Sequence, residues 1–241
     1  MTEMLFRTDP YQRDAAGVVT DITPEGGIVL DQTVFYPNGG GQPGDSGWIH
    51  WDTRSLPIAT TIKARGRGGE IILVPAEPAA LPPLGARITQ SLDWDRRHRH
   101  MRVHTALHLL SVAIPFGVTG GQISATHGRL DFDMPDAPQD RDEIEAALND
   151  FIARDLRVSD GWISEDELDA NPQLVKTMAV KPPRGTGDIR LVRIGEADHW
   201  IDLQPCGGTH VARTGEIGAL RLGKIEKKGR LNRRVYLHLD T

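Results

Sequence analysis

The sequence feature that most constrains the fold is a set of four metal-ligand side chains split between two distant segments. His104 and His108 stand four residues apart, and about a hundred residues later Cys206 and His210 repeat the same spacing. Imidazole and thiolate are ligand types that Zn²⁺ takes, and they disfavour Mg²⁺ and Ca²⁺. A chain that uses all four must bring both segments together at one ion.

The first ligand pair lies on a predicted helix. Residues 96–114 contain no Gly or Pro, apolar residues recur there at helical spacing, and Pro115 supplies a stop. Residues four apart share one face of a helix, so His104 and His108 can aim their ring nitrogens at one point. Zinc peptidases combine this spacing with a Glu general base after the first His, whereas Thr105 follows here. The peptidase interpretation therefore lacks its base.

The second ligand pair contains the only cysteine of the chain, which excludes an intramolecular disulfide. A lone cysteine is normally a small buried hydrophobe, but the flanking proline, glycine pair and histidine are not typical of a core strand. Gly207 and Gly208 leave the backbone free to turn, so that His210 can face the same ion. We predict a zinc site with the ligands His104, His108, Cys206 and His210. Catalytic zinc usually keeps one position open, and we expect His210, which follows the glycines, to be the loosely held ligand.

These segments match a known family in order and spacing. His-Thr-Ala-Leu-His-Leu-Leu, followed by Cys-Gly-Gly-Thr-His-Val, resembles the editing domain of alanyl-tRNA synthetases and its free-standing relatives, the AlaX trans-editing proteins. The segments 92–97, 128–133 and 228–234 agree in the same order. The glycine-rich segment 36–47 resembles the amino-terminal domain of the medium-length AlaX type. The editing domain of threonyl-tRNA synthetases shares both ligand pairs, but the glycine-rich segment favours the alanyl side.

The resemblance implies a zinc-dependent hydrolase that deacylates mischarged tRNA(Ala), most of all Ser-tRNA(Ala) and also Gly-tRNA(Ala). The polar residues that match the family's pocket are Thr105, Gln122 and Thr209. One departure is that Gln204-Pro205 stands before Cys206, where the synthetases more often place an acid and an apolar residue. Two alternatives stay open: a non-catalytic RNA-binding protein with a structural zinc, and a deacylase for another mischarged tRNA. The sequence does not decide the oligomeric state.

The glycine-rich loop has two interpretations. Gly39, Gly40 and Gly41 could cradle a phosphate, but neither P-loop nor Rossmann spacing follows, so no nucleotide cofactor is predicted. From the residues alone, a plain turn between two strands explains the loop equally well. The resemblance implies that the loop lies against the editing pocket, where Gln42 and Asp45 are the side chains able to touch substrate.

The charge distribution bears on RNA binding. A net charge of −5 is unfavourable for a nucleic-acid partner, because phosphate neutralisation dominates such complexes. Two basic runs nevertheless abut the proposed metal segments, although a solvated face is the usual explanation of a charge run. The residues predicted to contact the tRNA backbone are Arg96, Arg97, Arg99, Lys227, Lys228, Arg230, Arg233 and Arg234.

The overall pattern predicts an α+β protein with two domains. Residues 1–88 hold short apolar runs punctuated by Gly and Pro, typical of a small β-barrel or sandwich, and we expect a β-barrel. Residues 89–241 would form the zinc-binding editing domain, with an antiparallel sheet packed by helices. Hairpins are expected from strands at 188–194 with 199–203 and 217–226 with 233–239, and further helices near 144–156 and after Ser164. No run is long enough to span a membrane and no signal peptide is visible, so a cytoplasmic protein is expected.

Overall fold

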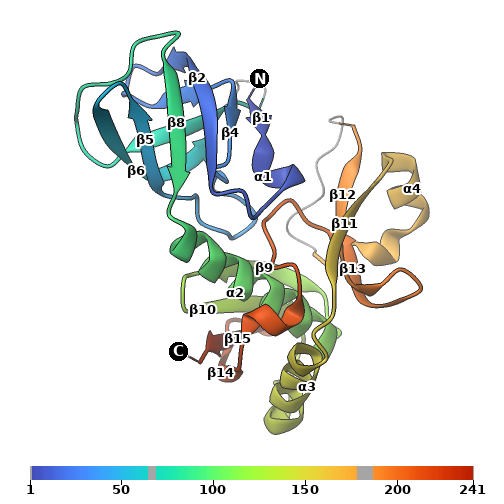
Figure 1. Cartoon of the computed structure of the whole chain (residues 1–241). Helices are drawn as coiled ribbons and strands as arrows, with labels where there is room; N and C mark the ends of the chain where they lie inside the picture. The colour runs from blue at the N-terminus through green and yellow to red at the C-terminus, as the bar shows by residue number, and fades with distance from the viewer. Residues whose placement is uncertain (1, 65–68, 178–186, 241) are drawn as a thin grey trace. The chain divides into compact units, whose positions relative to one another are not determined.

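The computed structural model describes residues 2–64, 69–177 and 187–240 (Figure 1). The helices within them are α1 (Leu5–Thr8), α2 (Trp94–Ala113), α3 (Arg141–Ala153), α4 (Glu165–Ala170) and the 3₁₀ turns Pro172–Leu174 and Thr214–Ile217. The strands are β1 (Glu3–Met4), β2 (Asp14–Ile22), β3 (Ile28–Leu30), β4 (Gln32–Thr33), β5 (Gly47–Trp51), β6 (Arg54–Lys63), β7 (Ile71–Pro75), β8 (Arg87–Leu92), β9 (Val118–Ile123), β10 (His127–Asp133), β11 (Val158–Ile163), β12 (Ile189–Glu196), β13 (His199–Pro205), β14 (Leu220–Lys227) and β15 (Asn232–Leu239). The α+β prediction is confirmed.

The chain forms two compact units, residues 1–99 and residues 100–241. The division that we expected at residue 88 lies earlier in the chain than this boundary, inside strand β8. This strand pairs with both β2 and β5 and so closes the barrel of the first unit. The segment that we expected to enter the second domain therefore belongs to the first, because backbone pairing holds it there.

The first unit is a closed barrel with the strand order β2-β3-β7-β6-β5-β8, which confirms the predicted β-barrel. Its interior is filled by inward-facing apolar side chains, among them Ile28, Ile49 and Leu73, none of which is exposed. Closure leaves no free edge between these strands, and the alternation of buried and exposed residues follows the two-residue period of a strand.

The second unit contains two antiparallel sheets, β14-β15-β10-β9 and β11-β12-β13. The predicted hairpins are present as β12 with β13 and as β14 with β15. The short helix after Ser164 is present as α4, with the reciprocal hydrogen bonds of a capping box between Ser164 and Glu167. Figure 1 shows α2 beside strands β9 and β10. Gly128 permits this approach, because a Cβ there would lie 2.7 Å from Val103 Cγ1 and 3.1 Å from Leu107.

Among the described residues, none of the helices has the length and apolar character needed to cross a lipid bilayer.

Candidate metal centre

The four predicted ligands meet within the second unit. His104, His108, Cys206 and His210 each offer one ligand atom, and these atoms all lie within 4.8 Å of one another. Helix α2 supplies the first two, and the turn after β13 supplies the others. The three histidines are buried, with exposed fractions of 8%, 7% and 4%, and Cys206 is partly exposed. Of the four residues, Cys206 is the most accessible.

The two known distances between the thiol and its histidine neighbours fit a tetrahedral zinc. Cys206 Sγ lies 3.4 Å from His104 Nε2 and 3.3 Å from His210 Nε2. Tetrahedral zinc with ordinary bond lengths would set a sulfur and a nitrogen ligand about 3.5 Å apart. The donor set, three imidazoles and a thiol, also suits zinc in kind.

A buried carboxylate anchors the ring of His108. Asp202 Oδ2 lies 2.8 Å from His108 Nδ1, and Asp202 is 1% exposed. If Nδ1 carries the proton and donates it to the carboxylate, Nε2 keeps its lone pair for a metal. Gln204 Nε2 donates to the same Asp202 oxygen at 2.8 Å and to Ser111 Oγ at 3.3 Å. Asp202 is thus the orienting residue of this ligand.

A hydroxyl anchors the ring of His210 in the same way. Thr105 Oγ1 lies 3.1 Å from His210 Nδ1, donates to the carbonyl of Met101 at 3.0 Å and accepts from Val211 N–H at 3.3 Å. With a proton on Nδ1, the one donor and two acceptor positions of this hydroxyl are all filled. The ring of His210, which we expected to be the loosely held ligand, is buried and has Thr105 as a partner.

The electrostatics of the cluster favour a thiolate. Burial opposes ionisation of Cys206, but the neighbouring imidazoles of His104 and His210 outweigh it and hold the thiol pKa well below its usual range. Burial, together with the charge of His104, lowers the pKa of His210 to about 3. Burial also raises the cost of ionising Asp202, yet the hydrogen bond from His108 lowers its pKa to about 2. At His108 burial is outweighed by the hydrogen bonds to Asp202 and Cys206, which raise the pKa of this ring to about 9, so His108 must release a proton when a metal binds.

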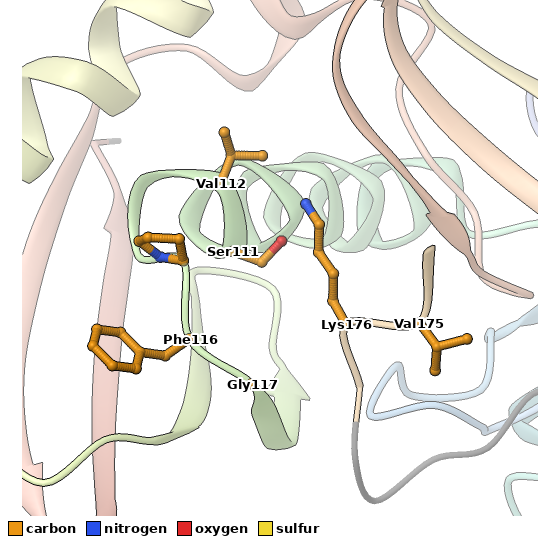
Figure 2. Close-up of a pocket in the computed structure, with 7 residues that line it drawn as sticks. Ser111, Val112, Phe116, Gly117, Val175 and Lys176 are labelled. Carbon is orange, nitrogen blue, oxygen red and sulfur yellow. The ribbon is translucent and has the colours of Figure 1, made fainter. Parts of the chain in front are cut away.

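A cavity of about 380 Å³ lies at the carboxyl end of α2 (Figure 2). Its polar members, Ser111 on α2 and Lys176, both contact the residues that orient His108. Lys176 Nζ lies 2.5 Å from Asp202 Oδ1, and Ser111 accepts from Gln204. The cavity is therefore linked to the ligands through side chains behind His108. The remaining lining residues are Val112, Pro115, Phe116, Gly117 and Val175.

Comparisons with known proteins agree with this geometry. The family model "Threonyl and Alanyl tRNA synthetase second additional domain" matches residues 189–236, and that of class II (A) tRNA synthetases matches residues 12–96. The alanyl-tRNA editing protein AlaX-M of Methanosarcina acetivorans is 33% identical, with 99% of each chain covered. The chain belongs to the AlaX family of alanyl-tRNA editing proteins. AlaX-M of Saccharolobus solfataricus is 35% identical over 98% of each chain.

Longer relatives, one AlaX protein and one alanine–tRNA ligase, match this chain over only part of their own length. AlaX-L of Pyrococcus horikoshii is 30% identical over 95% of this chain and 56% of its own length. The alanine–tRNA ligase of Pyrobaculum calidifontis is 34% identical over 94% of this chain but only 25% of the ligase. Both units of the present chain therefore recur together inside larger proteins.

Gln122 does not lie where the sequence led us to expect. Its exposed side chain accepts from Arg129 Nε at 3.2 Å, across the β9–β10 pairing. The neighbouring pair, Ile123 with Gly128, faces α2, and side chains of successive strand residues point to opposite faces. Gln122 therefore lies on the sheet face turned away from the helix that carries His104 and His108. Thr105 and Thr209 are both buried, and Thr105 contacts a ligand.

The glycine-rich loop is a tight turn of the first unit. Gly39 and Gln42 exchange both backbone hydrogen bonds, and Gly40 and Gly41 have φ values of 58° and 83° between them. Two consecutive left-handed residues are typical of a hairpin turn that favours glycine. Gln42 is fully buried. Asp45 is 1% exposed and forms an ion pair with Arg97, so its carboxylate is not a free substrate contact.

The predicted tRNA-backbone residues divide into two groups. Arg97 and Arg233 are buried and donate to Asp45 and to backbone carbonyls respectively, so the expectation that they contact phosphates is wrong. Arg96 donates to the carbonyl of Gly44, and Arg234 pairs with Asp131. The exposed members are Arg99, Lys227, Lys228 and Arg230.

Sequence reasoning missed Asp202, Lys176 and Ser111. Asp202 had a visible signal, since residues 202, 204 and 206 alternate along one strand and so share the face that bears the thiol. Lys176 had none, because only the fold brings it to this carboxylate.

Proposed function

We propose that this protein hydrolyses the ester bond of mischarged tRNA(Ala), with Ser-tRNA(Ala) as the preferred substrate and Gly-tRNA(Ala) as a second one. The observation that carries the proposal is the convergence of three imidazoles and a thiol, each with its outer contacts arranged for metal binding. Family membership supplies the substrate class, and we infer a cytoplasmic location, where tRNA is charged.

Zinc is the ion that we assign to this site. Bound there, it would polarise the ester carbonyl or the attacking water, or orient the amino acid. The chain's own contribution is positional. Asp202 and Thr105 hold the rings of His108 and His210 with Nε2 directed inward, so that little rearrangement accompanies binding.

The partly exposed Cys206 marks the side from which a substrate enters. Thr209, buried directly before His210, remains our candidate for contact with the amino acid. A polar group that pairs with the serine hydroxyl is left unpaired when alanine enters, and this difference can protect correctly charged tRNA. The exposed cations Arg99, Lys227, Lys228 and Arg230 are our candidates for contact with the tRNA backbone.

The test incubates purified zinc-loaded protein with Ser-, Gly- and Ala-tRNA(Ala) and follows release of the amino acid. We expect serine to be released fastest and alanine slowest. Cys206→Ala should remove zinc and activity together. If no ester is cleaved faster than in the zinc-free control, the editing function is excluded and the alternative of an RNA-binding protein with a structural zinc is favoured. Serine attached to tRNAs that are specific for other amino acids tests the third possibility, a deacylase for another mischarged tRNA.

A further inference from the structure

An exposed aromatic side chain lies on the same sheet row as the cysteine ligand. Cys206 N–H donates to the carbonyl of Arg190 at 3.1 Å, which continues the β12–β13 pairing past Pro205. On the other side of β12, Arg190 pairs directly with Trp162 of β11. Directly opposed residues of neighbouring strands point to the same face, so Trp162 and Arg190 share the face of Cys206. Two strand spacings place the Trp162 and Cys206 backbones about 10 Å apart.

This face is the one turned to the metal centre. Asp202 and Gln204 alternate with Cys206 along β13, and both contact the residues around His108. Arg190 between Trp162 and Cys206 is held in place, because its Nη1 donates to the carbonyls of Cys206 and Gly208 at 3.1 and 3.0 Å. Arg190 therefore supports the turn that carries Cys206 and His210, here called the ligand turn. Trp162 is the next side chain on this face, on the side of Arg190 away from Cys206.

Trp162 is not packed as a core residue. The indole is 49% exposed although it lies within a row that bears buried groups. The ligand turn is open as well, since a Cβ added at Gly207 would meet no atom within 4 Å. A large aromatic surface thus borders the accessible side of the cluster.

We propose that Trp162 binds the adenine of the 3′-terminal adenosine by stacking, while the aminoacyl ester on its ribose lies at the metal ligands. The inference rests on the proposed function. Base and ester of this nucleotide are separated by one ribose, a span that two side chains rooted about 10 Å apart can bracket. Stacking suits the position, because it needs only an open aromatic face and tolerates a wet environment.

The test compares Trp162→Ala with Trp200→Ala in zinc-loaded protein. Trp200 is the matched control, since it is also 49% exposed and belongs to the same sheet, at the opposite end of β13. With Ser-tRNA(Ala), Trp162→Ala should raise KM between roughly fivefold and a hundredfold with little change in kcat. Trp162→Phe should recover part of the loss. Trp200→Ala should leave both constants near the wild-type values.

A second substrate separates base stacking from other roles. For wild type, the KM for Ser-tRNA(Ala) whose terminal ribose lacks its base should be higher than the KM for the intact substrate, by a factor similar to that of the Trp162→Ala change. For Trp162→Ala, removal of the base should raise the KM no further. The inference is overturned if Trp162→Ala has the wild-type KM for the intact substrate. It is also overturned if removal of the base raises the KM of Trp162→Ala by the same factor as it raises the KM of wild type.

Binding is measured apart from turnover with a non-hydrolysable seryl-amide of adenosine, by titration of wild type and Trp162→Ala. Weaker binding by the variant supports the inference even if wild type cleaves no ester, an outcome that would overturn only the proposed function. Equal binding overturns the inference and leaves the function standing. Zinc content and circular dichroism of each variant check that the fold is retained.

Discussion

At the scale of single residues, the side chains behind the ligands account for the geometry of the cluster. Asp202 and Thr105 each occupy the Nδ1 side of a histidine, and both are buried. A buried ring nitrogen with a fixed partner has one tautomer and one orientation. The two residues therefore fix the orientation of the His108 and His210 rings.

Replacing Asp202 tests this arrangement. Asp202→Asn keeps the shape but removes the charge that holds the proton on His108 Nδ1, and we expect zinc affinity to fall about 10- to 100-fold. Competition with a chromophoric chelator measures the affinity. Asp150→Asn, at an exposed position of α3, is the control and should bind zinc as wild type does. Unchanged affinity in Asp202→Asn would contradict the orienting role.

Thr105→Val removes the hydroxyl and keeps the shape of the side chain. The buried Val211 N–H and His210 ring then lose an acceptor, so we expect the free energy of unfolding of the zinc-free protein to fall by about 1–3 kcal/mol. Urea unfolding gives this difference. Thr105→Ser retains the hydroxyl and should recover most of it; a serine variant as unstable as the valine variant would speak for packing instead.

At the scale of elements, the contact of α2 with β10 decides whether the two histidines of the helix reach the ligand turn. This contact depends on the missing side chain of Gly128, since neighbouring atoms of Val103 and Leu107 occupy the space. A β-branched residue in a helix has little freedom to move aside. The sheet and the helix are therefore close because one residue is small.

Gly128→Ala should accordingly destabilise the second unit. We expect a loss of about 1–3 kcal/mol in the free energy of unfolding, from overpacking against a stiff neighbour. Thermal or urea unfolding measures it. Gly161→Ala introduces the same methyl group into open space and should change stability far less. Equal stabilities of the two variants would show that α2 and β10 can separate without cost.

The pairing of β10 with β15 carries a carboxylate with two cationic partners. Burial opposes ionisation of Asp131, but Arg234 and Arg129 outweigh it and hold its pKa below the usual 3.8. A lowered pKa in the folded state adds stability above pH 3.8 that is lost as the pH falls through the folded-state value.

Asp131→Asn is therefore expected to be less stable than wild type by about 1–2 kcal/mol between pH 5 and 7, discounted for partial exposure. The difference should shrink as the pH falls from 3.8 through the lower folded-state pKa, below which the wild-type carboxylate is also neutral. Urea unfolding across this range checks the sign. A difference that persists at the lowest pH would assign the effect to shape and not to charge.

At the scale of the whole molecule, the four candidate metal ligands all belong to the second unit, residues 100–241. Zinc at a hundred times its dissociation constant should therefore stabilise that unit by about 2.7 kcal/mol, by mass action. Hydrogen exchange with and without zinc localises the gain. We expect slower exchange in α2 and β13 and little change in the barrel strands. The same experiment on Cys206→Ala is the control, and a gain spread equally over the barrel would contradict this assignment.

The fold was predictable wherever a local pattern was strong. The helix bearing His104 and His108, the capping box at Ser164 and both hairpins follow from periodicity and turn residues, which act over short stretches of chain. The place of β8 in the barrel was not predictable, because its pairing with β2 and β5 joins segments that are distant in sequence. The grouping of His104, His108, Cys206 and His210 was predictable because few residue types bind zinc, and the spacing of these residues marked them out.

What the sequence by itself determined is the chemistry: four ligands of the right kind, on a helix and on a glycine turn, in a chain of the AlaX family. Only the tertiary structure decided which polar residues serve that chemistry. It buried Arg97 and Asp45 together as an ion pair, turned Gln122 to the other face of its sheet, and brought Asp202 and Lys176 behind His108. The physical reason is that residue type is a property of one position, whereas burial, facing and hydrogen-bond partners depend on which distant segments the folded chain brings together.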